Sequence, residues 1–272
     1  MVFKKLVWTF KRHPFLYISR FKLLSKNSNS QAINEYYYNQ LNTLEDIPSY
    51  FSTINDSIFN DGKPSDDIDR VKILTVWLRK HIKGGPGLSE PSEEALKIML
   101  EGKGGVCSDI VQIFNNFCVL NGIKVREWGS TRTPFDQDFG GHSFNEIYSK
   151  ELKKWVLIDV SSCVLFYNTH TKIPLSVIEL YQLVRSKSPL EYDSFYKTKY
   201  FSEKSVFNNY LNPKTTPFLI CNYSNKTYDK YLKYTRSFLP VFVIHFVLYL
   251  LNKSYYYLFP LDDYRKIFLD KI

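Results

Sequence analysis

Hydrophobic residues recur at helical spacing in two central segments of the chain, residues 66–82 and 107–120. Both segments begin after a polar or glycine-containing stretch and stop at glycines, as amphipathic helices commonly do. Further helices are predicted over part of residues 34–60, over residues 93–100 and over residues 174–187. The central pattern therefore predicts helices that each bury one face.

Strand-like segments follow the second helix. Residues 123–128 alternate in polarity, and residues 142–148 and 155–159 are rich in aromatic and β-branched side chains. The polar residues 149–152 suit a four-residue hairpin loop. The predicted pairs are Tyr148 with Lys153, Glu146 with Trp155, Phe144 with Leu157, and His142 with Asp159. Directly opposed residues share a face of the sheet, so this register places a carboxylate beside an imidazole.

Candidate chemistry lies at the start of the second helix. Cys107 follows Gly104 and Gly105 and occupies the first helical turn, where the helix dipole favours a thiolate. A thiol nucleophile needs a base, and the base needs an orienting partner. The hairpin supplies both, since His142 and Asp159 are predicted to lie side by side. We therefore predict a Cys-His-Asp triad. A structural role for Cys107, as a buried cysteine, is the alternative.

Three motifs in this order resemble the transglutaminase-like superfamily, the papain-like group that includes transglutaminases and peptide N-glycanases. The matching pieces are residues 105–107 (GVC), residues 142–148 (HSFNEIY) and residues 155–159 (WVLID). The resemblance covers about residues 66–162. Val160 stands where the family often has proline.

This resemblance implies an α+β fold with a cysteine-bearing helix on a small antiparallel sheet, and catalytic roles for Cys107, His142 and Asp159. It implies a thiol-dependent acyl hydrolase or acyl transferase acting on a peptide or other amide-bearing substrate through a thioester. Water or an amine could accept the acyl group, and the sequence leaves that choice open. The alternative function is a catalytically inactive binding or scaffold protein that retains the fold, at a membrane surface for example.

Composition and charge bear on the partner of the protein and on its location. The chain of 272 residues carries a formal net charge of +9, which suggests an anionic neighbour or serves solubility alone. No zinc-finger, RNP or helix-turn-helix pattern supports nucleic acid as the partner. The four cysteines form no C-x-x-C pair, so the sequence indicates no disulfide framework, metal site or cofactor and favours a reducing, cytoplasmic location. Cys118 is predicted to be a core residue.

Two flanking segments bear on membrane contact. Residues 1–26 carry seven basic and no acidic side chains among many aromatic ones, which suits either an anionic bilayer surface or a helix packed on the domain. Residues 237–252 are uncharged apart from His245 and could be buried, interfacial or membrane-spanning. We expect three regions: a basic amphipathic segment (1–30), the transglutaminase-like core (31–172) and a mostly helical, aromatic-rich extension (173–272). The expected location is the cytoplasm, either free or peripherally attached to the inner face of a membrane.

Overall fold

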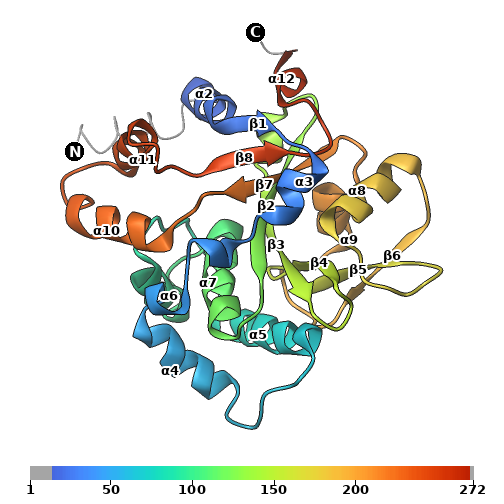
Figure 1. Ribbon diagram of the computed structural model, residues 1–272, viewed down its shortest axis with the longest axis horizontal. Coiled ribbons are helices and arrows are strands. Elements are labelled where there is room, and N and C mark those ends of the chain that lie inside the picture. Colours follow the sequence, from blue (N-terminus) through green and yellow to red (C-terminus); the bar gives the residue numbers. More distant parts are fainter. Residues whose placement is uncertain (1–13, 270–272) are drawn as a thin grey trace.

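The computed structural model describes residues 14–269 as an eight-stranded, mostly antiparallel sheet with helices packed around it (Figure 1). The strands are β1 (Ser25–Asn27), β2 (Val125–Arg132), β3 (His142–Ser149), β4 (Lys154–Asp159), β5 (Val164–Asn168), β6 (Leu190–Ser194), β7 (Thr215–Cys221) and β8 (Tyr256–Phe259). Their order across the sheet is β1-β8-β7-β2-β3-β4-β5-β6, and β1 pairs with β8 in parallel. The predicted α+β class is confirmed, although the sheet is larger than predicted.

Helices make up most of the remaining regular structure. The α-helices are α2 (Pro14–Leu24), α3 (Ser30–Glu35), α4 (Ser49–Ile58), α5 (Asp67–His81), α6 (Ser92–Leu100), α7 (Cys107–Leu120), α8 (Val177–Ser186), α9 (Glu203–Val206), α10 (Asn225–Thr235), α11 (Val241–Leu250) and α12 (Tyr264–Ile267). Short 3-10 helices are η1 (Tyr38–Gln40), η2 (Leu44–Asp46) and η3 (Gln137–Phe139), and η4 (Phe207–Leu211) is a π-helix. The central helices begin and end within a few residues of their predicted limits.

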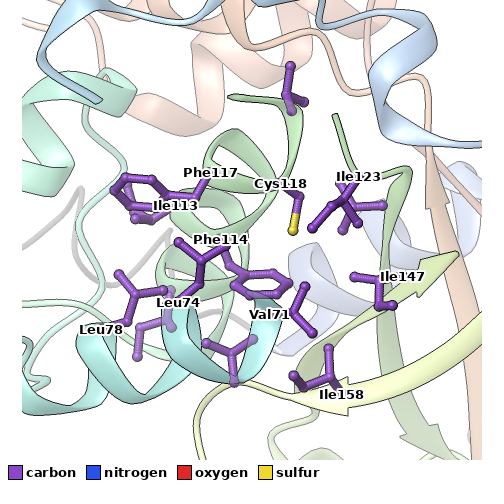
Figure 2. Close-up of a cluster of buried hydrophobic side chains, with 14 of the residues drawn as sticks. Val71, Leu74, Leu78, Ile113, Phe114, Phe117, Cys118, Ile123, Ile147 and Ile158 are labelled. Carbon is purple, nitrogen blue, oxygen red and sulfur yellow. The ribbon is translucent and has the colours of Figure 1, made fainter. Parts of the chain in front are cut away.

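The largest hydrophobic core lies between the sheet and helices α4 to α7. Figure 2 shows side chains of α5 and α7, among them Leu74, Phe114 and Phe117, meeting Ile147 and Ile158 from β3 and β4. Cys118 points into the same cluster and is fully buried, as predicted from its position on the helix. The N-terminal end of α7 is thereby held at a defined place against the sheet.

A second core covers the opposite face of the sheet. It joins Trp128, Phe144 and Leu157 of the central strands to α8 and to Tyr210 of η4. The strands alternate between the two cores: Ile147 faces α7, whereas Phe144 faces α8. The sheet is therefore the middle layer of the molecule, and its strand ends lie where the two cores meet the surface.

The hairpin register differs from the prediction by two residues. The observed pairs include Tyr148 with Trp155 and Glu146 with Leu157, because the loop comprises residues 150–153 and Ser149 pairs with Lys154. Lys153 takes a left-handed conformation (φ 52°) at the end of this loop, which the sequence did not indicate. A shift of two residues keeps every side chain on its predicted face.

The C-terminal hundred residues contribute more to the sheet than their predicted helical character suggested. β6, β7 and β8 all come from this region, and β7 pairs directly with the central strand β2. The sheet thus crosses both predicted region boundaries, at residues 30 and 172, and those boundaries stay predictions. Of the predicted basic N-terminal segment, residues 1–13 lie outside the described residues; α2 begins at Pro14.

Candidate active site

The thiol of the site is fixed by a glycine turn and a helix start. Gly105 adopts φ 109°, and a Cβ there would lie 2.8 Å from the side chain of Met99, so the position favours glycine on both counts. Its N–H donates to Pro86 O and its carbonyl accepts from Gly85 N. Two residues later Cys107 is the first residue of α7 and is partly exposed. The sequence signal of two glycines before a helix therefore located this turn correctly.

A carboxylate secures the residues just before the thiol. Asp109 Oδ2 accepts hydrogen bonds from the backbone N–H of Val106 (2.9 Å) and of Leu88 (3.2 Å). This satisfies two backbone donors at the start of α7 and ties the loop at residues 85–88 to the helix. Burial raises the pKa of Asp109, and these backbone bonds oppose that rise.

The imidazole and the carboxylate come from adjacent strands. His142 is the first residue of β3, Asp159 is the last of β4, and His142 Nε2 lies 3.1 Å from Asp159 Oδ2. Both side chains are buried, to 9% and 1% exposure. The structure thus brings together the two predicted residues, but His142 reaches Asp159 diagonally, since continuing the observed register puts Phe144 opposite Asp159.

Asp159 is held in place by backbone donors. Its Oδ1 accepts from the N–H groups of Ser161 (2.9 Å) and Ser162 (3.1 Å), which leaves Oδ2 for His142. Burial would raise the pKa of Asp159, but the charge and hydrogen bond of His142 prevail and lower it. The carboxylate is therefore ionised and fixed in orientation.

The charges of the three groups support one another. Burial disfavours the imidazolium of His142, yet Asp159 and Cys107 together raise its pKa to about 10. Burial likewise disfavours the thiolate of Cys107, but the hydrogen bond and charge of His142, with a hydrogen bond from the backbone of Ser143, lower its pKa. A thiolate beside an imidazolium is the form that these shifts favour.

The other three cysteines differ from Cys107 in both exposure and ionisation. Cys118, Cys163 and Cys221 are buried, and all four cysteines are free. Burial raises the pKa of Cys118 and Cys221 and raises that of Cys163 to about 12. Cys107 alone among them combines access with a lowered pKa.

Tyr210 completes the surroundings of the pair and was missed in the sequence. Its buried ring lies edge-on to His142, with centroids 5.7 Å apart, and also contacts Phe144 and Phe166. Its hydroxyl makes a polar contact with Asp159, looser than an ordinary hydrogen bond, that lowers the pKa of the carboxyl. Tyr210 belongs to the π-helix η4, and π-helical turns are frequent at functional sites. Residues 188–235 carry no motif that could have marked it.

Two further features lie near the site: a buried carboxyl on β2 and the loop before His142. Glu127 on β2 is a buried carboxyl whose pKa is raised by burial and by the charges of Cys107 and Asp109. β2 continues beyond residue 128, where the predicted strand ended, to Arg132, so the loop before His142 comprises residues 133–141. This loop borders a surface cavity of about 450 Å³, which is lined by Arg132, Pro134, Phe135, Asp136, Asn212 and Lys214.

No helix within residues 14–269 combines the length and the apolar character needed to cross a bilayer. Across the same described residues, no cluster of three or more His, Cys, Asp or Glu side chains could hold a metal ion.

The site places a helix-tip thiol beside an imidazole and a carboxylate from two paired strands. Residues 54–160 match the model of the Transglutaminase-like superfamily, so this part of the chain is similar to a superfamily of thiol-dependent enzymes. Among solved structures, a candidate cysteine protease from Cytophaga hutchinsonii is similar at 19% identity and a TM-score of 0.32. That similarity covers 41% of this chain and 37% of the other, so this chain spans well under half of that structure. A comparison with curated proteins gives no match.

Proposed function

We propose that the protein is a cysteine-dependent acyl hydrolase that cleaves amide bonds with Cys107, His142 and Asp159 as its catalytic residues. The observation that carries this proposal is the position of His142: its Nε2 lies 3.1 Å from Asp159 Oδ2, and its imidazole is near enough to the Cys107 thiol to lower the pKa of that thiol.

The reaction follows from this arrangement. The Cys107 thiolate attacks the carbonyl carbon of the substrate, and the carbonyl electron pair moves onto oxygen. The backbone N–H of Cys107, at the start of α7, is placed to donate to that oxyanion. When the intermediate collapses, the C–N bond breaks and the His142 imidazolium gives its proton to the departing amine, leaving a thioester.

The second half of the reaction returns the thiolate. His142, now neutral, takes a proton from water as the water oxygen attacks the thioester, and the acid product leaves. Asp159 holds the imidazole ring and stabilises its charge in both halves. Water is the acceptor favoured here because Cys107 is partly exposed, whereas transfer to an amine requires that water be kept out.

The proposal is tested by acylation and by alkylation. Mixing the protein with p-nitrophenyl acetate should release a burst of p-nitrophenol equal to the amount of protein, and Cys107→Ala should abolish it. Iodoacetamide should label Cys107 first, at a rate that rises through a pKa below 9.0, the ordinary value for cysteine. The matched variant Cys118→Ala, on the same helix, should keep both properties.

Hydrolysis and transfer are separated by adding an amine. If an alkyl primary amine such as n-butylamine intercepts the acyl group in preference to water, the enzyme is a transferase. No burst, together with labelling of Cys107 no faster than that of an ordinary exposed thiol, would instead indicate a non-catalytic scaffold with a transglutaminase-like fold.

A further inference from the structure

An exposed apolar surface lies on the helix α11, far along the chain from the thiol site. α11 is apolar along its whole length apart from His245, so it has no polar face to turn to solvent. Val241, Ile244 and Leu248 pack against Tyr228 and Leu232 of α10. A helix that is apolar all round normally has both sides covered, by protein or by lipid.

No segment within residues 14–269 covers the other side of α11. Its outward side chains and those just before and after it form the α11 surface: Phe238 (69% exposed), Phe242 (40%), Phe246 (59%), Tyr249 (41%), Leu250 (66%) and Leu251 (50%). Phe242, Phe246, Tyr249 and Leu250 are spaced three or four residues apart from one turn to the next, so these four lie along one side of the helix. An apolar surface of this extent is uncommon on a protein that remains alone in water, and it marks an interaction site.

The charges around the α11 surface have a single sign. Between Asp229 and Asp262 the sequence has four basic residues and no acidic one. Lys230, Lys233 and Lys253 are exposed, and no described carboxylate lies within ion-pair distance of them.

The nearest acid does not offset this charge at the surface. Asp229 accepts hydrogen bonds from the backbone N–H (2.9 Å) and the hydroxyl of Ser92, and is thereby turned towards α6. Arg236 pairs with Glu90. Aromatic and leucine side chains flanked by unpaired lysines match the two parts of an anionic membrane surface, acyl chains and headgroups.

We infer that the α11 surface docks the protein onto an anionic lipid bilayer, with α11 lying in the plane of the interface. Ten residues of helix are about 15 Å long, half the hydrocarbon thickness, so α11 inserts sideways and does not cross. The exposed aromatic side chains enter the headgroup boundary, and Lys230 and Lys233 on α10 contact lipid phosphates. The ribbon places α10 and α11 together at one margin of the molecule, apart from α5 and α8, so docking leaves the rest of the fold unchanged (Figure 1).

The test uses the full chain and sucrose-loaded vesicles of phosphatidylcholine, with and without phosphatidylserine. The wild type should sediment with the phosphatidylserine vesicles only. The variant Phe246→Glu with Leu250→Glu should bind at least about tenfold more weakly, because two inserted side chains become charged. The variant Lys230→Gln with Lys233→Gln should lose about 10- to 30-fold.

A matched control shows whether weaker binding results from changing the α11 surface or from adding negative charge anywhere on the protein. Leu44→Glu with Leu152→Glu alters two leucines of 61% and 39% exposure elsewhere and should bind as the wild type does. Iodoacetamide labelling of Cys107 at the wild-type rate shows that each variant is folded. Unchanged binding of the α11 variant, or equal binding to both vesicles, would overturn the inference. So would concentration-dependent self-association without lipid that the α11 variant loses, which would assign this surface to a second copy of the chain.

Discussion

Two buried pairs of opposite charge lie on the same face of the central sheet, and they differ in how completely they are enclosed. Near the hairpin loop, Arg126 Nε lies 2.7 Å from Glu146 Oε2, with 2% and 0% exposure. At the other end of the same ribbon, His142 lies 3.1 Å from Asp159, with 9% and 1% exposure. Both pairs are buried, yet only the second has a partly exposed thiol beside it.

The Arg126–Glu146 pair is closed on every side. Glu146 also accepts from Trp128 Nε1 (2.8 Å) and from Val177 N (2.8 Å), and Arg126 donates to Ile33 O. The guanidinium lies 3.9 Å from the ring centre of Trp155. Both carboxylate oxygens of Glu146 accept from protein donors, and Arg126 Nε and Nη1 both donate to protein acceptors, so this pair joins the strands, α8 and α3 and is shielded from any ligand.

The His142–Asp159 pair is open in one direction. Asp159 is satisfied by two backbone N–H groups and by His142, but the imidazole still faces Cys107. An imidazolium held by a buried carboxylate stabilises an anion on its free side, and here that anion is the thiolate of Cys107. The comparison shows that burial alone does not distinguish the pair proposed as catalytic, whereas incomplete enclosure beside a thiol does.

The largest effect is expected from Asp159→Asn. Asparagine keeps an oxygen for Ser161 and Ser162 but replaces the acceptor that faces His142, so the pKa of His142 should fall well below about 10. The burst rate with p-nitrophenyl acetate should drop by about 10²- to 10⁴-fold. The pH profile of Cys107 alkylation should move towards the ordinary thiol pKa. The matched change Glu146→Gln should leave that profile in place, and a shift there would remove the distinction between the two pairs.

The next effect, on stability, should come from Arg126→Met. Removing the guanidinium leaves the Glu146 carboxylate buried and uncompensated, which typically costs about 3–5 kcal/mol. Urea unfolding followed by circular dichroism measures this free energy of unfolding. Below the unfolding transition, Cys107 alkylation should remain within about twofold of the wild-type rate, because Arg126 does not contact the thiol site. Loss of alkylation in the still-folded variant would show that the two ends of the ribbon are coupled.

The smallest effect is expected from Tyr210→Phe, which removes a hydroxyl from the open pair and keeps the ring. Asp159 has a lowered pKa in the folded protein, so its contribution to stability is present above its ordinary pKa of 3.8 and is lost as the pH falls through the folded value. Without the hydroxyl that folded pKa should rise towards 3.8. The free energy of unfolding at pH 7 should then fall by about 0.5–1 kcal/mol relative to that at pH 3.

The control for this prediction is the double variant. In an Asp159→Asn background, Tyr210→Phe should no longer change the pH dependence of unfolding. A change of equal size in both backgrounds would mean that Tyr210 acts through packing alone.

The elements that carry the proposed catalytic residues could be predicted from the sequence, whereas the way in which the strands pair could not. Short-range patterns predicted the helix start at Cys107 and the strands bearing His142 and Asp159, because a dipeptide of glycines and a helical repeat are local signals. The register was wrong by two residues, since loop geometry, here the left-handed Lys153, determines it. Each side chain still lies on its predicted face of the sheet, because the register differs from the prediction by two residues, an even number.

Long-range partners were beyond the reach of sequence patterns. Tyr210 lies in η4 just before β7, which pairs with β2, and nothing in its own sequence neighbourhood indicates that it would meet His142. Likewise Glu146 on β3 is paired with Arg126 on β2, a partner that no local pattern around Glu146 indicates. Such contacts depend on tertiary packing, which overrides local preference.

The parallel pairing of β1 with β8 has a consequence for how the molecule is made. Ser25 is opposite Tyr257, so one edge of the sheet joins two strands that lie far apart in the sequence. During translation β1 must wait for β8 to be made before it acquires its neighbour, and contacts of such sequence separation form slowly. Ribosome-bound fragments ending before β8 would leave β7 as an unprotected edge, open to pairing with other nascent chains.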